Sequence, residues 1–586
     1  MCGIIIGLLR QNTREAQIAK ALDQLKHRGP DAQAGEYFLD RRFFLGHTRL
    51  KVIDLTDQAN QPLSSNDNRY RIVFNGEIYN YKELAAELHN EYKPKTKSDT
   101  EIILPLYKKY GAEMLSKLRG MFSLCILDTI RGELFVARDR FGIKPLYYVE
   151  TSSGIYLASE IPPLLDILQK SHPDLGVIRN FVETGLYEFG NRTFFEGVKR
   201  FPAGHYAFLD LEKTSVEPKK WYDLLENIQD YSRREPRELI ELFKHQCAEV
   251  VRFHMVADVE VGINLSGGVD SSLLAFFASK ESGDLQSFTQ DWPGYSEAHW
   301  VKIMTESLGI RSNFVHVNAG MVRSAIEKVV KFQSEPFGGF PVIGYHYLYQ
   351  EAVKNNITVL LDGNGLDESF LGYDKYRRIH QNCMPNVKGQ INNVCDGVSA
   401  IDGTMHMNAS EILGPELKDV TSYDPIIQKP FESDVKNAAY NDLVQTKIPR
   451  GLRFNDRASM MHSRELRVPF LDHNLVELGF SLPIDLLIGE KGTKEIVRRA
   501  AMGCISTNLS MAPKRSVQSP QREWLAGEMK DFVLSVIESK SFSSRMWFNK
   551  DTVKREYKNY QNSDRENSFH VWQWVNLELW AREFLD

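Results

Sequence analysis

The sequence predicts an α/β protein of several domains: an N-terminal α+β layered domain, then an α/β domain with a parallel sheet and a helical tail. Three observations support this fold class. The chain has 586 residues, which is too long for one compact core. Short extended apolar runs crowd the first 210 residues, whereas strands and helices alternate from residue 236. From about residue 440 the apolar residues recur mostly with helical period.

The composition is typical of a globular protein. Hydrophobic residues make up 42% and charged residues 25%, and a net charge of −5 offers no basic excess for nucleic acid. No apolar stretch approaches the ~18 residues of a membrane span, so we expect no membrane insertion. Six unpatterned cysteines argue against a disulfide framework, and the N-terminus lacks the basic region of a signal peptide. We therefore expect a cytoplasmic protein.

The layered domain is expected to occupy residues 1–210. The apolar N-terminus indicates a buried first strand, and other strands are predicted at 42–46, 71–74, 121–128, 133–137 and 154–158. Helices are predicted at 14–26, 81–90 and 99–111. Polar residues dominate 211–235, which we interpret as a linker.

The second domain is expected to occupy residues 236–586. It begins with a predicted helix at 236–252, followed by strands at 259–265, 286–291, 313–317 and 357–362. Between these strands lie predicted helices at 270–280, 296–309, 320–333 and 342–355. Because parallel strands need crossover connections, this alternation predicts a parallel sheet. The polar stretch 380–430 shows little periodicity and is interpreted as an insertion or mobile loop.

The most specific local pattern is SGGVDSS at 266–272, between a predicted strand and a predicted helix. Its two glycines let the backbone approach a ligand, and N–H groups at a helix start attract anions. Ser266, Ser271 and Ser272 add hydroxyl groups, and Asp270 can hold a divalent cation beside phosphates. The G-K-[ST] ending of the Walker pattern is missing. An ordinary turn before a helix is the alternative, but the coincidence of these groups favours a phosphate loop.

Cys2 is a candidate nucleophile because it follows the initiator Met1. Once Met1 is removed, the thiol lies beside a free α-amine, which can act as its general base. Asn75 and Gly76 follow a predicted strand and offer a side-chain amide and a backbone N–H for an oxyanion hole. A buried structural cysteine is the alternative if Cys2 is considered alone.

Three charged residues complete this N-terminal constellation. Arg49 can grip a carboxylate in bidentate fashion, and Glu77 provides an acid for an amide or ammonium group. Asp99 follows Ser98 at a helix start, where it is free to meet a ligand ammonium. A thiolate, an oxyanion hole, a carboxylate clamp and an ammonium acceptor are together what hydrolysis of the glutamine side-chain amide requires.

These motifs resemble those of asparagine synthetase (glutamine-hydrolysing), B type, over nearly the whole chain. The N-terminal motifs are MCGI at 1–4, HRGPD at 27–31, RLKVIDL at 49–55, NGEIYN at 75–80, SDTE at 98–101, RDRFGIKPLYY at 138–148 and ASE at 158–160. The C-terminal motifs are SGGVDSS at 266–272, LDGNGLDESFLGY at 361–373 and RELRVPFLD at 464–472. The resemblance implies an αββα glutaminase of the N-terminal nucleophile type, a class II glutamine amidotransferase, fused to an ATP-pyrophosphatase domain.

The resemblance also implies roles for individual residues. Cys2 would be the glutaminase nucleophile, and the glutamine-binding residues would be Arg49, Ile53, Asn75, Gly76, Glu77 and Asp99. ATP would be bound by Leu265, Ser266, Gly267, Gly268, Asp270, Ser271, Ser272, Gln290, Asp362 and Gly363. Asp270 and Asp367 would hold Mg2+, and Lys514 would stabilise charge on the phosphates. The acceptor would meet Asn364, Asp367 and Glu368.

The reaction implied by the resemblance uses glutamine, ATP and a carboxylate acceptor. ATP activates the acceptor as an acyl-adenylate, and ammonia from glutamine then displaces AMP after passing through an internal tunnel. A homodimer is left open.

The second motif departs from the usual family form, in which Ser-Gly-Glu-Gly precedes an Asp-Glu pair. Here Asp362 replaces the serine and Asn364 replaces the glutamate. An amide at 364 cannot act as a base and brings no net charge to a cationic amine. The acceptor is therefore either aspartate, with Asp362 restoring the charge, or another carboxylate such as a uronic acid of surface polysaccharides.

Two other functions are disfavoured. Relatives that close a β-lactam ring need no ammonia and have lost the glutaminase nucleophile, whereas Cys2 is present here. A sensor or scaffold without activity would predict decay of the phosphate loop or of the glutaminase residues, and both are intact.

Overall fold

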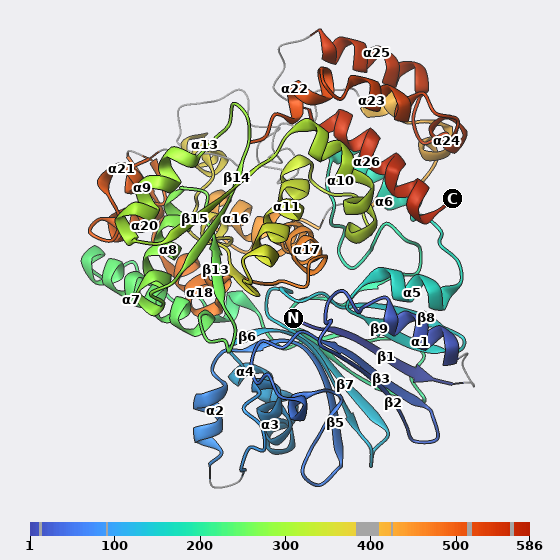
Figure 1. Cartoon of the computed structure of the whole chain (residues 1–586), viewed down its shortest axis with the longest axis vertical. Coiled ribbons are helices and arrows are strands. Elements are labelled where there is room, and N and C mark those ends of the chain that lie inside the picture. Colours follow the sequence, from blue (N-terminus) through green and yellow to red (C-terminus); the bar gives the residue numbers. More distant parts are fainter. Residues whose placement is uncertain are drawn as a thin grey trace.

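A computed structural model describes residues 1–10, 15–89, 92–382, 409–423, 426–490, 492–512, 518–562 and 568–586. Two stacked antiparallel sheets form the N-terminal half, and a parallel sheet surrounded by helices forms the C-terminal half (Figure 1). The predicted fold class, an α+β layered domain followed by an α/β domain with a helical tail, is therefore confirmed.

The first antiparallel sheet has the strand order β10-β8-β9-β1-β3-β2. Its strands are β1 (Gly3–Leu9), β2 (Ala32–Phe38), β3 (Phe43–Arg49), β8 (Tyr147–Thr151), β9 (Gly154–Ala158) and β10 (Lys199–Arg200). The predicted N-terminal strand is thus central in this sheet and every residue of it is buried. Its position carries Cys2, the residue before it, into the interior.

The second antiparallel sheet has the order β12-β11-β7-β6-β5-β4. Its strands are β4 (Leu63–Ser64), β5 (Tyr70–Ile78), β6 (Gly120–Asp128), β7 (Glu133–Arg138), β11 (His205–Asp210) and β12 (Lys219–Lys220). The two sheets pack through apolar side chains such as Ile4, Leu8 and Val73. Because side chains alternate along a strand, each sheet has a second apolar face left to cover.

Helices cover those outer faces and complete an αββα arrangement. Helices α1 (Glu15–Asp23) and α5 (Ile161–Leu168) pack on the first sheet through a core that includes Ile5 and Leu22. Helices α2 (Tyr81–Glu87), α3 (Ile103–Tyr110) and α4 (Met114–Lys117) pack on the second sheet. The predicted helix at 99–111 begins as a 3-10 turn, Asp99–Ile102, which α3 follows directly.

The segment 211–235 contacts both halves of the molecule. Within it, β12 pairs with β11 and so extends the second sheet beyond residue 210. Leu224 then packs into the apolar core of the C-terminal half. The segment therefore joins the two halves and packs against both.

The parallel sheet has the order β15-β14-β13-β16-β17. Its strands are β13 (Val261–Asn264), β14 (Gln286–Asp291), β15 (Arg311–His316), β16 (Val359–Leu361) and β17 (Glu465–Arg467). Around it lie α7 (Pro236–His254), α8 (Val269–Glu281), α9 (Ala298–Leu308), α10 (Ala319–Gln333) and α11 (Phe340–Lys354). These positions agree with the predicted alternation to within a few residues.

The fifth strand, β17, is an addition to the sequence prediction, which expects mostly helix after residue 440. It is only three residues long, and helices flank it: α16 (Asp434–Val444) and α17 (Lys447–Met460) before, α18 (His473–Ser481) after. It pairs in parallel with β16, with Leu361 opposite Arg467. A strand this short carries too little periodicity to be detected from sequence.

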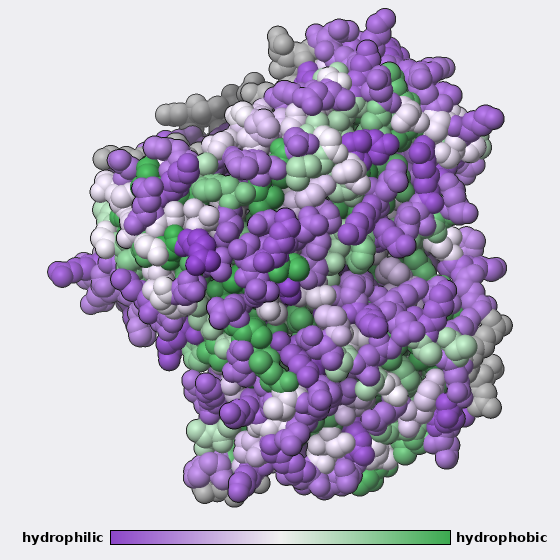
Figure 2. All heavy atoms as spheres, in the orientation of Figure 1, coloured by the Kyte–Doolittle hydropathy of each residue, from purple (hydrophilic) through white to green (hydrophobic). Residues whose placement is uncertain are grey.

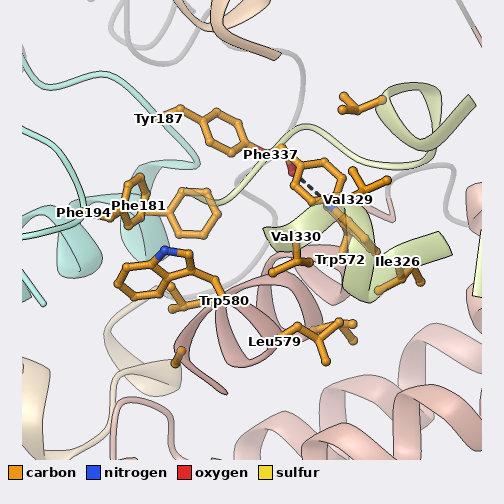
Figure 3. Close-up of a cluster of buried hydrophobic side chains, with 14 of the residues drawn as sticks. Phe181, Tyr187, Phe194, Ile326, Val329, Val330, Phe337, Trp572, Leu579 and Trp580 are labelled. Carbon is orange, nitrogen blue, oxygen red and sulfur yellow. Dashed lines mark hydrogen bonds between the residues drawn. The ribbon is translucent and has the colours of Figure 1, made fainter. Parts of the chain in front are cut away.

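The helical tail comprises α22 (Gln521–Ala526), α23 (Lys530–Ile537), α24 (Lys540–Arg545), α25 (Lys550–Gln561) and α26 (Phe569–Phe584). Helix α26 is buried on nearly all sides, and Trp572 and Trp580 lie in an aromatic and aliphatic cluster with Phe337 and Phe181 (Figure 3). Indole N–H groups of Trp572 and Trp580 donate to backbone carbonyls at 2.8 and 2.9 Å. Phe181 belongs to α6 (Leu175–Thr184), so the tail connects to the N-terminal part of the chain.

Of the predicted insertion 380–430, residues 383–408, 424 and 425 lie outside the described residues. The described part contains α14 (Ala409–Ile412) and α15 (Pro415–Lys418), and Tyr423 exchanges hydrogen bonds with Asn180. Hydrophilic side chains dominate the face shown in Figure 2, with apolar side chains in small groups between them. None of the described helices combines the length and apolarity needed to cross a bilayer.

Candidate functional site

The thiol-bearing residue Cys2 lies where the two antiparallel sheets meet. Its N–H donates to Asn75 Oδ1 of β5 at 3.0 Å, and its carbonyl accepts from Arg28 Nε at 3.0 Å. Asn75 Nδ2 is buried and has no hydrogen-bond partner among the described residues. An amide donor held beside the thiol and without a partner is what an oxyanion hole needs. Gly76 follows it at a close approach to β6, where a Cβ would lie 2.1 Å from the Met121 carbonyl.

Burial and the neighbouring charges shift the pKa of the Cys2 thiol in opposite directions. Burial raises the pKa of the thiol, while the N-terminal ammonium, a backbone hydrogen bond from Leu50 and the charge of Arg49 lower it. The ammonium of Met1 forms an ion pair with Glu465 of β17 at 2.7 Å. A thiolate at this position would therefore depend on nearby cations.

Arg49 is buried at the end of β3, where its guanidinium organises the following loop. It donates to the Thr56 carbonyl at 2.7 Å, to Asn60 Oδ1 at 2.9 Å and to the Ile53 carbonyl at 3.3 Å. It also donates to the Asp54 carbonyl. None of the described carboxylates forms an ion pair with it. The predicted clamp residues Arg49 and Ile53 are thus brought together.

Glu77 and Asp99 are two buried carboxyl groups of the same site. Asp99 accepts a hydrogen bond from the Ile78 N–H at 2.8 Å, and burial raises its pKa to about 6. Burial raises the pKa of Glu77 well above its usual range, and the charges of Glu465 and Asp99 add to this effect. Two carboxyl groups in one buried site suit a ligand that brings an ammonium, because the positive charge of the ligand would favour their ionised forms.

Two residues of the C-terminal half also face this site, Glu465 and Arg467 of β17. The sequence presents them only as part of the motif 464–472. Arg467 lies 3.5 Å from Glu77 and 2.6 Å from Glu465. The sequence does contain a signal for Glu465 and Arg467: they are two charged residues, separated by one residue, in a strand that is buried.

The second site lies at the carboxyl ends of the parallel strands, where ligands bind in open α/β sheets. The turn 266–272 follows β13, and α8 begins at Val269. Gly267 has φ +68°, a conformation that favours glycine, and a Cβ there would lie 2.7 Å from Trp300 Cβ. Ser272 Oγ is buried without a hydrogen-bond partner among the described residues. The local geometry at this helix start would suit a phosphate group.

Asp270 and Asp367 converge on a lysine that the sequence analysis does not identify. Lys494 Nζ lies 2.6 Å from Asp367 Oδ1 and also forms an ion pair with Asp270. Lys494 is 1% exposed and has φ +59°. The predicted catalytic residue Lys514 lies outside the described residues. The sequence feature that marks Lys494 is its position directly before helix α20 (Glu495–Ala501).

A cleft of about 150 Å³ collects most of the predicted nucleotide residues. Predicted residues on its wall are Leu265, Ser266, Asp270, Ser271, Gln290, Asp362, Gly363, Asn364 and Asp367. Aromatic residues that the sequence analysis does not single out complete the wall: Phe288, Trp292, Tyr295 and Tyr345. Gly267, Gly268, Ser272 and Glu368 are not among its lining residues. Carboxylates and hydroxyls at one end with aromatic rings beside them suit a nucleotide.

Asp362 and Asn364, the two residues that depart from the usual family form, both lie on the cleft wall and share a hydrogen bond. Asp362 accepts a hydrogen bond from Asn264 Nδ2 at 2.9 Å and another from the Asn364 N–H at 3.1 Å. Burial raises the pKa of Asp362 despite both bonds. The carboxyl group is therefore held in one orientation at the cleft wall. Glu368 lies deeper, with Tyr373 donating to it at 2.7 Å, and burial raises its pKa to about 7.

The donor set at Asp270 and Asp367 fits magnesium. Proteins usually hold this ion through one or two carboxylates, with waters and substrate phosphates as the other ligands. Both carboxylates already converge on one cation, Lys494. Among the described residues, no group of three or more His, Cys, Asp or Glu side chains is placed to hold a metal ion.

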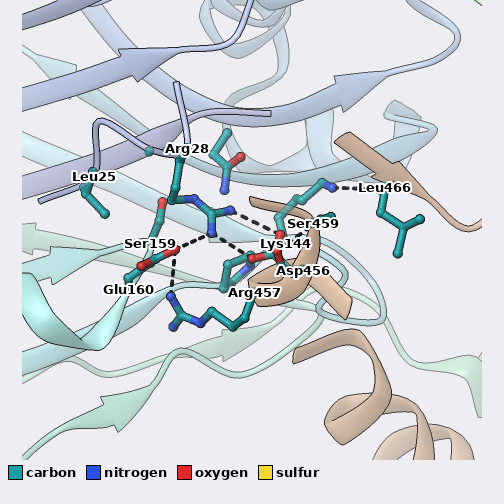
Figure 4. Close-up of polar contacts among 12 residues, drawn as sticks. Leu25, Arg28, Lys144, Ser159, Glu160, Asp456, Arg457, Ser459 and Leu466 are labelled. Carbon is teal, nitrogen blue, oxygen red and sulfur yellow. Dashed lines mark hydrogen bonds and ion pairs between the residues drawn. The ribbon is translucent and has the colours of Figure 1, made fainter. Parts of the chain in front are cut away.

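A buried charge network connects the two halves beside Cys2 (Figure 4). Arg28 donates to Glu160 at 2.7 Å and to both oxygens of Asp456 at 2.8 and 3.1 Å. Arg457, which adjoins Asp456 on α17, forms an ion pair with Glu160 at 2.9 Å. Since Arg28 also bonds the Cys2 carbonyl, helix α17 of the C-terminal half supports the position of the thiol.

Comparisons with known proteins agree in both halves. Residues 1–222 match a family model described as a glutamine amidotransferase domain, and residues 242–582 match the asparagine synthase model. The chain is 29% identical to asparagine synthetase (glutamine-hydrolyzing) 1 of Bacillus subtilis, over 99% of this chain and 96% of the relative. It is 30% identical to asparagine synthetase (glutamine-hydrolyzing) 2 of Bacillus subtilis, over 88% and 71%. It is 26% identical to amidase chry2 of Gibberella zeae, over 88% and 86%.

Proposed function

The chain belongs to the asparagine synthase family, and on this premise we propose that it is an ATP-dependent carbon–nitrogen ligase that takes its nitrogen from glutamine. The observation that carries the proposal is the pairing of two sites in one chain. Cys2 and Asn75 form a thiol site whose amide donor has no partner among the described residues, and Asp270 and Asp367, both paired with Lys494, line a cleft suited to a nucleotide. Neither site alone would account for amide synthesis.

In the glutaminase half, we assign Cys2 as the nucleophile on the glutamine side-chain carbonyl. Asn75 Nδ2 and the Gly76 N–H would stabilise the developing oxyanion. Arg49, in the loop that contains Ile53, would hold the glutamine carboxylate, and Glu77 and Asp99 would hold its ammonium. Removal of Met1 would place the α-amine of Cys2 beside its own thiol as general base.

In the synthetase half, ATP would adenylate the acceptor carboxylate and release pyrophosphate. Magnesium, when bound by Asp270 and Asp367, would neutralise phosphate charge. Lys494, already between these carboxylates, would stabilise the charge that develops on the pyrophosphate as it leaves. Ammonia then attacks the acyl carbon of the adenylate, the amide bond forms, and AMP departs.

The acceptor is proposed to be a carboxylate bound near Asp362 and Asn364. Aspartate is the first candidate, because the relatives over nearly the full chain are named asparagine synthetases. A uronic-acid carboxylate is the second candidate, because Asn364 brings no charge and the Asp362 carboxyl is occupied by Asn264. Pyrophosphate release with aspartate, compared with uronic acids and their nucleotide-linked forms, distinguishes the two.

The experiment that tests the proposal is the variant Cys2→Ala. It removes the nucleophile, so turnover with glutamine as nitrogen donor should be lost, whereas turnover with ammonium salt should persist. Product amide and pyrophosphate are measured with each nitrogen source. Equal loss with glutamine and with ammonia would contradict the assignment of two separate sites.

A further inference from the structure

The wall of the thiol site opposite Glu77 comes from the other half of the molecule. Glu465 and Arg467 lie on β17, and both side chains are fully buried at the boundary with the N-terminal domain. In a strand, residues two positions apart point to the same face. Leu466, between them, packs instead with the apolar residues Phe288 and Leu348. The strand therefore directs two charges towards the glutaminase site.

The guanidinium of Arg467 is fixed on three sides. It donates to Glu465 at 2.6 Å, to the His254 carbonyl at 2.6 Å and to the Val256 carbonyl at 2.7 Å. Its remaining nitrogen, Nη2, faces Glu77 Oε2 at 3.5 Å. Neither of these two atoms has a hydrogen-bond partner among the described residues. The pair is close enough for charge attraction, and the Glu77 oxygen keeps its capacity to accept from a ligand.

The charges that face the Glu77 carboxyl act in opposite directions. Burial and the acids Glu465 and Asp99 raise its pKa, whereas Arg467 and the N-terminal ammonium lower it. A protonated Glu77 cannot attract the ammonium of an amino-acid ligand. Arg467 therefore favours the form of Glu77 that binds such a ligand.

Arg467 also touches the nucleotide site through its backbone. Its carbonyl accepts a hydrogen bond from the Asp362 N–H at 2.9 Å, at the point where β16 ends. The same residue thus contacts a predicted glutamine-binding side chain and the loop that begins the motif 361–373. Any displacement of β17 would alter both contacts.

We propose that Arg467 is a positioning residue of the glutamine site, supplied across the domain boundary. It positions the Glu77 carboxyl group and adds a positive charge beside it that favours the ionised form needed by the glutamine ammonium, so glutamine binds well only when the two domains are docked. The assignment deepens the proposed function and rests on it. It concerns binding, so its effect belongs in the KM for glutamine more than in kcat.

The variant Arg467→Met tests this role. The KM for glutamine in the glutaminase reaction should rise about 10-fold or more at pH 7, since a charge-assisted contact is lost. The rise in KM at acidic pH should begin at a higher pH than in the wild type, because Glu77 takes up a proton more readily. Arg467→Lys should restore most of the affinity. The other titratable groups near Glu77 are unchanged in these variants: Cys2, Tyr79, Tyr81, Asp99 and Glu465.

Arg119→Met is the matched control. Arg119 is another buried cross-domain arginine, bound to Asp472 at 2.6 Å and to Glu249 at 2.9 Å, and it does not pair with Glu77. A structural loss at the boundary would raise the KM in both variants alike. An effect confined to Arg467→Met supports the proposal, and an equal effect in the two variants overturns it.

A second variant, Glu465→Gln, covers the case in which Arg467→Met does not fold. It removes a negative charge that faces Glu77, so the acidic rise in KM should move to lower pH, opposite to the first shift. An unchanged profile or a shift to higher pH overturns the proposal. If the wild-type protein hydrolyses no glutamine, the proposed function is wrong. If the wild type does hydrolyse glutamine, and the variants keep its KM and its pH profile, only the inference about Arg467 is wrong.

Discussion

At the scale of single residues, the burial of Lys494 is what makes it a candidate functional residue. A lysine is rarely enclosed, and this one is held between Asp270 and Asp367. Its neighbours in sequence give no strong pattern, since the two aspartates are 224 and 127 positions away. The family resemblance assigns the role to Lys514, which lies outside the described residues, whereas the structure places Lys494 against both aspartates.

Lys494→Met should reduce ATP-dependent pyrophosphate release by about 100-fold or more, because one preorganised charge at the leaving group is lost. Glutamine hydrolysis should continue, since Cys2 is unaffected. Pyrophosphate release is measured with circular dichroism as a check of folding. Lys514→Ala serves as the comparison: a large loss there, with activity kept in Lys494→Met, would return the role to Lys514.

Glu368 predicts a pH dependence of stability. Burial, then the charge of Asp367, raises its pKa from 4.5 to about 7. Between these values the folded state keeps a proton that the unfolded state loses, so this group reduces stability as pH rises from about 4.5 to 7. Glu368→Gln should therefore gain up to roughly 3 kcal/mol over the wild type at pH 8.

The measurement for Glu368→Gln is urea unfolding at pH 5 and at pH 8. The glutamine can still accept the Tyr373 hydrogen bond, so the packing is kept. The gain in free energy of unfolding should be present at pH 8 and small at pH 5. A gain of equal size at both pH values would show that protonation is not its cause.

At the scale of elements, the turn between β13 and α8 needs a specific backbone conformation. Gly267 has positive φ and no room for a Cβ beside Trp300, whereas Gly268 has φ −76° and meets only Ser266 Oγ at 3.5 Å. The two glycines of this motif therefore have different structural roles. The first is required by the fold, and the second leaves space beside the turn.

Gly267→Ala should lower the free energy of unfolding by about 1–3 kcal/mol, through backbone strain and the contact with Trp300. Gly268→Ala, the matched control, should be close to neutral, since alanine adopts this φ without strain. Urea unfolding of both variants without ligand measures the difference. Equal destabilisation by both substitutions would contradict the separate roles.

At the scale of the whole molecule, charged groups buried at the domain boundary connect the two sites. Arg28 with Asp456, Arg119 with Asp472 and Arg467 with Glu77 each join one half to the other. Breaking a buried pair is costly, about 3–5 kcal/mol, because it leaves a charge without its partner. The boundary therefore fixes one relative placement of the two halves.

If the two sites act in one reaction, their products should form in fixed ratios. In the presence of acceptor, ATP and glutamine, each amide formed should be accompanied by one AMP, one pyrophosphate and at least one glutamate. Chromatography of the nucleotides and an amino-acid assay measure the ratios. ADP as the main nucleotide product would exclude adenylation and contradict the proposed synthetase half.

The sequence by itself determined the fold class and predicted the thiol site and the phosphate loop. These features rest on local signals: period-2 strands, crossover helices, Cys2 after the initiator and the turn 266–272. Only the tertiary structure decided that Lys494, Glu465 and Arg467 belong to the two sites, and that β17 forms a fifth strand. These three side chains form ion pairs with residues 127 to 464 positions away along the chain. The physical reason is that burial and charge pairing across a boundary depend on distances in space, which local periodicity does not encode.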